Sequence, residues 1–229
     1  MEEKNDDVPL SPARIVVGIV FNCKRGMNRQ TPDAEAEYDS MDTVHAIRDV
    51  FIGAGMKTVL LECDETLARK LSDSHIDIAF NIAEGVGGRG REAEAPALFN
   101  LLGVPYTGSD ETALCVALDK ALCKKLLSAS RVLTPRFRVF TSENNIRPGG
   151  LRFPVIVKPN AEGSSKGIPD ACVASDEAEF KALVRRELQL YGGPVLAEEY
   201  IHGREFTVGL LGNGDSLRVF PPMEIVFRG

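Results

Sequence analysis

The stretch FPVIVKPNAEGSSKG, residues 153–167, decides the fold that the sequence predicts. Its residues 154–157 are apolar and mostly β-branched, which is typical of a buried strand, and Lys158 follows at the strand's end. Pro159 stops the strand, and the small residues after it can turn backbone N–H groups and hydroxyls toward an anion. The spacing is not that of a P-loop. Two interpretations therefore remain, a phosphate-binding loop and an ordinary flexible hairpin.

The residues before this stretch alternate between strand and helix patterns. Residues 15–21, 57–62 and 76–82 read as strands, with a helix capped by Ser40 and a short helix over residues 65–71 between them. This β-α-β-α-β order predicts a parallel sheet with helices on both faces. We expect residues 1–13 to be a flexible lead-in and residues 14–108 to form the first domain.

A glycine loop, GVGGRG at residues 85–90, follows the third predicted strand. Gly85, Gly87 and Gly90 satisfy the G-x-G-x-x-G pattern of dinucleotide-binding proteins, and a helical segment comes next. That pattern belongs on the first strand of a nucleotide-binding half, whereas the first strand here leads into an unrelated loop at Asn22. The alternative is a loop that brings backbone close to a small substrate.

The second half predicts an antiparallel arrangement. A strand and turn are expected over residues 103–108 and a long helical zone after Ser109, in which Lys120, Lys124 and Lys125 form a mostly solvated face. Further on, Ser175 is the expected cap of another helix, and a hairpin turn is expected at residues 213–214. Strands are expected over residues 136–140, 171–174, 195–201, 205–211 and 217–220.

Two adjacent acids, Glu198 and Glu199, interrupt an otherwise apolar predicted strand. Because strand residues alternate between faces, one of them must point inward or into a cleft. A carboxylate there could accept from an adenine amino group or from ribose hydroxyls, and Glu205 follows just past a turn. Charges that protect an edge strand are the alternative.

Composition excludes several classes of protein. The chain of 229 residues has 44% hydrophobic residues and a formal charge of -6, without a basic block or an apolar run long enough for a membrane helix. We therefore expect a globular, cytoplasmic protein that binds neither nucleic acid nor membranes. The N-terminus has no signal-peptide pattern. Five scattered cysteines without C-x-x-C spacing predict buried thiols and no disulfide or zinc framework.

Several ordered motifs together resemble the D-alanine-D-alanine ligases of the ATP-grasp superfamily. They are PYTGS at residues 105–109, LDK at 118–120, PVIVKP at 154–159, EGSS at 162–165, and EE at 198–199 followed by GREFTV at 203–208. The resemblance extends from about residue 15 to residue 225. It implies an α/β ATP-grasp fold, with an N-terminal parallel domain, a central ATP-binding subdomain over residues 109–201, and the start of a C-terminal subdomain from residue 202.

The resemblance also implies a chemistry and a set of site residues. ATP would phosphorylate one amino acid's carboxylate, and the amine of a second would displace phosphate, with Mg²⁺ as cofactor and a role in peptidoglycan synthesis. Charge builds up on phosphoryl oxygens, which cationic groups stabilise. The implied roles are ATP binding for Lys120, Lys158, Ser165, Glu198, Glu199, Ile201 and Glu205, positioning of the attacking amine for Ser164, and substrate binding for Glu35 or Glu37, Glu84 and Gly87.

The sequence departs from the family pattern in two places. Ala83-Glu84-Gly85 stands where many of these ligases have a histidine-glycine pair, so D-alanine is not assured as substrate. The family's metal-binding Asp, Glu and Asn and an oxyanion-stabilising Arg belong to a third domain, and residues 221–229 match only its beginning. We therefore expect no metal ligands and no turnover from these 229 residues alone. A non-catalytic ATP-binding module and a dinucleotide-dependent oxidoreductase are the alternatives, and a homodimer is left open.

Overall fold

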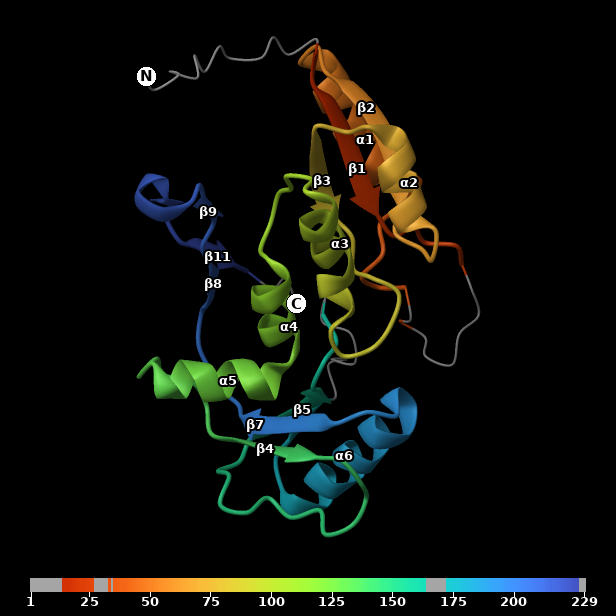
Figure 1. The fold of residues 1–229 in the computed structure, drawn as a ribbon. Helices are drawn as coiled ribbons and strands as arrows, with labels where there is room; N and C mark the ends of the chain where they lie inside the picture. The colour runs from red at the N-terminus through yellow and green to blue at the C-terminus, as the bar shows by residue number, and fades with distance from the viewer. Residues whose placement is uncertain (1–13, 27–32, 34, 164–171, 227–229) are drawn as a thin grey trace.

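The computed structural model describes residues 14–26, 33, 35–163 and 172–226. Its first part is a parallel sheet of β1 (Val16–Phe21), β2 (Lys57–Glu62) and β3 (Ile78–Ile82), in the order β2-β1-β3 (Figure 1). β1 is central and almost entirely buried, as its apolar sequence VVGIVF requires. The predicted parallel sheet is confirmed.

Helices cover both faces of this sheet. α1 (Met41–Gly53) packs Val44 against Ile19 and Phe21 on one face. α2 (Leu67–Ser74) and α3 (Glu94–Leu102) pack Leu67 and Phe99 on the other. The predicted cap of α1 is also confirmed, because the Ser40 hydroxyl accepts from the Thr43 N–H at 3.2 Å.

The predicted long helical zone is two helices, α4 (Glu111–Leu118) and α5 (Lys120–Ala129). The break falls at Asp119, whose carboxylate caps α5 by accepting from the Leu122 N–H at 3.0 Å. The strand expected over residues 103–108 is reduced to an isolated parallel bridge between Ala79 and Tyr106. Residues 104–107 therefore extend the parallel sheet by one pair only.

The second sheet is antiparallel, in the order β4-β7-β5-β6. Its strands are β4 (Phe137–Phe140), β5 (Val155–Pro159), β6 (Val173–Ala174) and β7 (Val195–Glu199), and α6 (Glu177–Tyr191) packs against it below the parallel sheet in Figure 1. Ser175 was the expected cap of α6, and this is wrong. The helix begins one residue later, so Asp176 accepts from the Ala178 and Glu179 N–H groups.

The remaining strands are short. β8 (Glu205–Thr207) pairs with β11 (Met223–Ile225), and β9 (Leu210–Leu211) pairs with β10 (Arg218–Val219) across the 3-10 turn η3 (Gly214–Ser216). The single strand expected over residues 205–211 is thus split in two. A second 3-10 turn, η2 (Arg91–Ala93), joins the glycine loop to α3.

Two expectations from composition can be compared with the described residues. Cys63 and Cys172 are buried as expected, whereas Cys115 is exposed. In the part of the chain that the structure describes, no helix has the length and apolar character needed to cross a membrane.

Candidate functional site

A cavity of about 310 Å³ brings together three of the predicted ATP-binding residues, Lys120, Lys158 and Glu198. β5 and β7 pair antiparallel with Ile156 opposite Glu198, so Lys158 is the diagonal neighbour of Glu198 on the same face. The Lys158 ammonium donates to Glu198 Oε1 at 2.5 Å. The strand pattern of the sequence thus places an ammonium and a buried carboxylate in contact on one face of the sheet.

Asn160 fixes the start of α5 over the end of β5. Its carbonyl accepts from the Lys120 N–H at 3.0 Å, its Oδ1 accepts from the Ala121 N–H at 2.9 Å, and its Nδ2 donates to Asp119 Oδ1 at 2.8 Å. These bonds bring the Lys120 side chain to the cavity, where its ammonium donates to the Glu162 carbonyl. Lys120 is therefore held against the beginning of the glycine-serine loop.

Lys124 lines the same cavity, and the expectation that it lies on a solvated face is wrong. The residue is only 7% exposed, and its ammonium donates to Glu198 Oε2 at 2.6 Å and to Thr134 Oγ1 at 2.5 Å. Lys124 lies one helical turn after Lys120, so both side chains share the face that meets the sheet, whereas Lys125 is exposed. The spacing of four residues was the signal that could have found it.

The lysines set the ionisation state of the Glu198 carboxyl in this cavity. Burial raises the pKa of the Glu198 carboxyl, but hydrogen bonds from Lys124 and Lys158 outweigh burial and hold that pKa below its ordinary value. Burial and the nearby Lys158 ammonium lower the pKa of Lys120, against the opposing effect of the Glu162 and Glu37 carboxylates. Neighbouring ammonium groups repel one another, so an anion in this cavity would relieve their repulsion.

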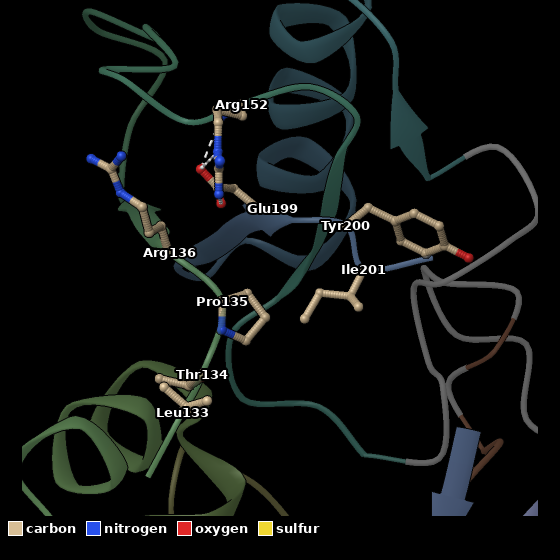
Figure 2. Close-up of a pocket in the computed structure, with 8 residues that line it drawn as sticks. All are labelled: Leu133, Thr134, Pro135, Arg136, Arg152, Glu199, Tyr200 and Ile201. Atoms are coloured by element: carbon tan, nitrogen blue, oxygen red, sulfur yellow. Dashed lines mark hydrogen bonds and ion pairs between the residues drawn. The ribbon is translucent and has the colours of Figure 1, made fainter. Parts of the chain in front are cut away.

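An adjoining cavity of about 490 Å³ contains the predicted residues Glu199 and Ile201 (Figure 2). It shares Thr134 and Pro135 with the lysine cavity. Glu199 points away from the Glu198 side of β7, and its carboxylate accepts from the Arg152 backbone N–H at 3.0 Å and from Arg152 Nη2 at 3.1 Å. One acid of the pair faces the lysines and its neighbour pairs with an arginine, as strand alternation requires.

A third cavity, of about 500 Å³, lies between the glycine loop and residues 161–162, and Glu37 and Gly87 line it. Arg91 donates through Nη2 to both Glu37 oxygens at 2.7 and 2.8 Å and through Nη1 to the Ala161 carbonyl at 2.8 Å. The Gly163 N–H also donates to Glu37. These contacts tie the part of the chain that holds the parallel sheet to the beginning of the glycine-serine loop. Sequence reasoning missed Arg91, although it directly follows the glycine loop.

Glu84, Glu92 and Glu37 place carboxylate oxygens within 4.8 Å of one another. Burial, together with the nearby Glu92 and Glu37 carboxylates, raises the pKa of Glu84 to about 7. Carboxylate oxygens suit Mg²⁺, but both oxygens of Glu37 already accept from Arg91, and Glu84 favours a proton near neutral pH. This group of acids, the one cluster of its kind among the described residues, does not fit a magnesium site.

Two other predicted site residues, Glu35 and Glu205, do not line these cavities. Glu35 accepts from the Arg25 and Gly26 N–H groups, at 3.1 and 2.8 Å. Glu205 is exposed at the start of β8. Ser164 and Ser165 lie outside the described residues. Of the two acids that could take the substrate-binding place, Glu37 is the one that lines a cavity.

Comparisons with known proteins identify relatives of this chain. Residues 138–229 match the family model described as D-ala D-ala ligase C-terminus. The chain is 33% identical over 188 residues to the D-alanine–D-alanine ligase of Pseudomonas putida (strain GB-1), which covers 81% of this chain and 56% of the relative. The chain therefore spans about half the length of the curated relatives it matches.

The fold of this chain matches solved structures over a larger share of its length than its sequence matches the curated relatives. The D-alanyl-alanine synthetase A of Vibrio cholerae O1 biovar eltor aligns with a TM-score of 0.69 at 15% identity, covering 95% of this chain and 68% of that one. The D-alanine–D-alanine ligase of Bacillus anthracis complexed with ATP aligns with a TM-score of 0.64 at 18% identity, covering 93% and 71%. At these identities the likeness shows the fold, which is the predicted ATP-grasp architecture.

Proposed function

Because the chain belongs to the D-alanine–D-alanine ligase family, we propose that it forms part of an ATP-dependent ligase that joins two amino acids through an acyl phosphate. In this proposal residues 14–108 form the substrate domain, residues 109–201 the central ATP-binding subdomain, and residues from 202 onward belong to a C-terminal subdomain. The observation that carries the proposal is the convergence of Lys120, Lys158 and Glu198, from three separate elements, on one cavity.

The lysine cavity is suited to the phosphate end of ATP. Lys120 and Lys158 present ammonium groups beside residues 161–163, and the charge that develops in phosphoryl transfer lies on equatorial oxygens that such groups stabilise. Glu198, ionised, can accept from the adenine amino group, and the strand end at Glu199 and Ile201 supplies backbone groups for the base edge. Glu205 binds the ribose and Ser165 a phosphate in this proposal.

The amino acids bind on the other side of residues 161–163. Glu37 and Gly87 line the cavity there, Glu84 adjoins Glu37, and Ser164 positions the attacking amine. Glu35 belongs to the same loop as Glu37 and helps to shape this end of the site. The identity of the amino acids is not carried over from the relatives, because Ala83-Glu84-Gly85 stands where the resemblance implies a histidine-glycine pair. The family implies Mg²⁺ beside ATP, and the Glu37, Glu84 and Glu92 cluster does not fit as its set of ligands.

A second candidate is a module that binds ATP without catalysis, and it is favoured by the same cavity. A dinucleotide-dependent oxidoreductase is the third, but its glycine pattern follows the edge strand β3 and leads into the three-residue turn η2. Titration of the protein with ATP and with NAD, followed by the shift of the thermal melt, separates the third candidate from the first two.

The decisive test of the lysine cavity is Lys158→Ala. A hydrogen bond to a charged group contributes about 1.5 to 3 kcal/mol, so ATP affinity should fall tenfold or more while the fold is retained. Lys125→Ala is the matched control, because Lys125 is an exposed lysine of the adjacent α5. Equal ATP affinity in the Lys158→Ala variant and the parent would overturn the assignment.

A further inference from the structure

Glu198 is held by two lysines from different elements, one on each carboxylate oxygen. Lys158 of β5 donates to Oε1 at 2.5 Å, and Lys124 of α5 donates to Oε2 at 2.6 Å. All three side chains are mostly buried. The proposed function uses Lys158 for phosphate and Glu198 for the base, and it gives Lys124 no role.

The ion pairing of Glu198 would change if Lys158 turned toward a phosphate, as the proposed function requires. Glu198 then loses the partner on Oε1, and a buried carboxylate without a partner is strongly unfavourable. Lys124 stays in place because it also donates to Thr134 Oγ1 at 2.5 Å and lies over the Phe137 ring, 5.2 Å from its centroid. Glu198 therefore keeps one ammonium partner whether or not Lys158 is engaged by nucleotide.

We propose that Lys124 is a positioning residue that keeps Glu198 ionised and oriented, so that Lys158 is free for the phosphates and Glu198 selects a base with an amino donor. An ionised carboxylate only accepts hydrogen bonds. It accepts from the 6-amino group of adenine and repels the 6-oxo group of hypoxanthine. This inference rests on the proposed function and adds the residue that sets the base preference of its nucleotide site.

The inference predicts a change in nucleotide selectivity as well as in affinity. Without Lys124, Glu198 holds Lys158 more strongly or takes up a proton, and a protonated carboxyl can donate to a 6-oxo group. We expect Lys124→Met to lower ATP affinity about tenfold and inosine triphosphate affinity much less. Lys124→Arg keeps the positive charge and should restore most of the ATP preference.

The experiment measures Kd values for ATP and inosine triphosphate by calorimetry on the parent, Lys124→Met, Lys124→Arg and Lys125→Met. Lys125→Met is the matched control, because Lys125 is the exposed neighbour on the same helix. A parent that binds no ATP overturns the proposed function itself. A parent that binds ATP, with an unchanged ratio of the two affinities in Lys124→Met, overturns only the role of Lys124.

A second pair of variants keeps the inference testable if Lys124→Met does not fold. Lys124→Met combined with Glu198→Gln leaves no buried carboxylate without a partner, and it is compared with Glu198→Gln alone. If Lys124 acts through Glu198, removing the lysine in this background should leave the ratio of ATP to inosine triphosphate affinity unchanged. A further change in that ratio would mean that Lys124 contacts the nucleotide directly, and the positioning role would be wrong.

Discussion

The lysine cavity and the third cavity, which lies beside the glycine loop, differ in the charged groups that line them. Three ammonium groups and the single carboxylate Glu198 line the first. The second is lined by two carboxylates, Glu37 and Glu162, and by two guanidinium groups, Arg89 and Arg91. Glu84 and Glu92 cluster with Glu37 beside it, and we call it the acidic cavity after that cluster. The first cavity therefore has an excess of positive charge that suits a polyanion, whereas the charges that line the second balance.

The largest expected effect on stability comes from removing the Arg91 guanidinium, which pairs with Glu37 at the acidic cavity. Arg91→Met leaves Glu37 without its bidentate partner, and the Glu37 side chain is only 2% exposed. Breaking a buried ion pair from one side typically costs about 3 to 5 kcal/mol. We expect a loss of that order in the free energy of unfolding, measured with urea at pH 7.

Arg89→Met is the matched control for this prediction. The Arg89 side chain is 75% exposed and pairs with Asp119 at 2.8 Å. Exposed ion pairs contribute about 0 to 1 kcal/mol, so the control should remain close to the parent. Equal losses in the two variants would show that the Arg91–Glu37 contact does not hold the part of the chain with the parallel sheet to residues 161–163.

A smaller effect should appear as a dependence of stability on pH. The pKa of Glu84 in the folded protein is about 7, above its ordinary value of 4.5. The contribution of this group to stability is therefore complete below pH 4.5 and is lost as the pH rises through about 7. The full shift corresponds to roughly 3 kcal/mol, and solvent screening of this half-buried carboxyl reduces it to about 1 kcal/mol. Glu84→Gln should therefore raise the unfolding free energy at pH 8 by about 1 kcal/mol relative to the parent, with little change at pH 4.

Urea unfolding of parent and variant at pH 4, 6 and 8 checks the Glu84 prediction. Glu65→Gln is the control, because Glu65 is exposed before α2. If Glu65→Gln changes the pH dependence of stability as much as Glu84→Gln does, the pKa of Glu84 is not raised by its surroundings. The carboxylate cluster would then not distinguish the acidic cavity from the lysine cavity.

Local patterns were enough to predict most strands and the inward direction of one acid in the 198–199 pair. Apolar runs mark β1 and β5, and alternation along β7 separates Glu198 from Glu199. Alternation also explains why Lys158 and Glu198 meet once the strands pair antiparallel with Ile156 opposite Glu198.

Residues whose roles depend on distant partners were not predicted. Lys124 has the sequence environment of a surface lysine, and only the packing of α5 on the second sheet turns it toward Glu198, 74 positions later. Arg91 meets Glu37 across 54 positions. The four-residue spacing from Lys120 could have placed Lys124 on the same helix face. No spacing in the sequence, however, identifies the distant carboxylate that either cation contacts.

The smallest expected effect on stability comes from Gly87→Ala, and the same variant tests which cavity the glycine loop contributes to. A Cβ at Gly87 would meet nothing within 4 Å, and its φ is not in the left-handed region, so Gly87→Ala should change the unfolding free energy by less than about 0.5 kcal/mol. Gly88 also has open space, but its φ of +85° makes Gly88→Ala cost about 1 kcal/mol.

Nucleotide binding distinguishes the uses of the glycine loop. Gly87 lines the acidic cavity and is not among the residues that line the lysine cavity, so Gly87→Ala should leave ATP affinity unchanged in a titration where Lys158→Ala loses tenfold or more. Under the proposed function, the added methyl group would narrow the acidic cavity and lower amino-acid-dependent turnover in a longer chain that is active. A large loss of NAD binding in Gly87→Ala would instead assign the loop to a dinucleotide, and the proposed division of the site into a nucleotide end and an amino-acid end would fail.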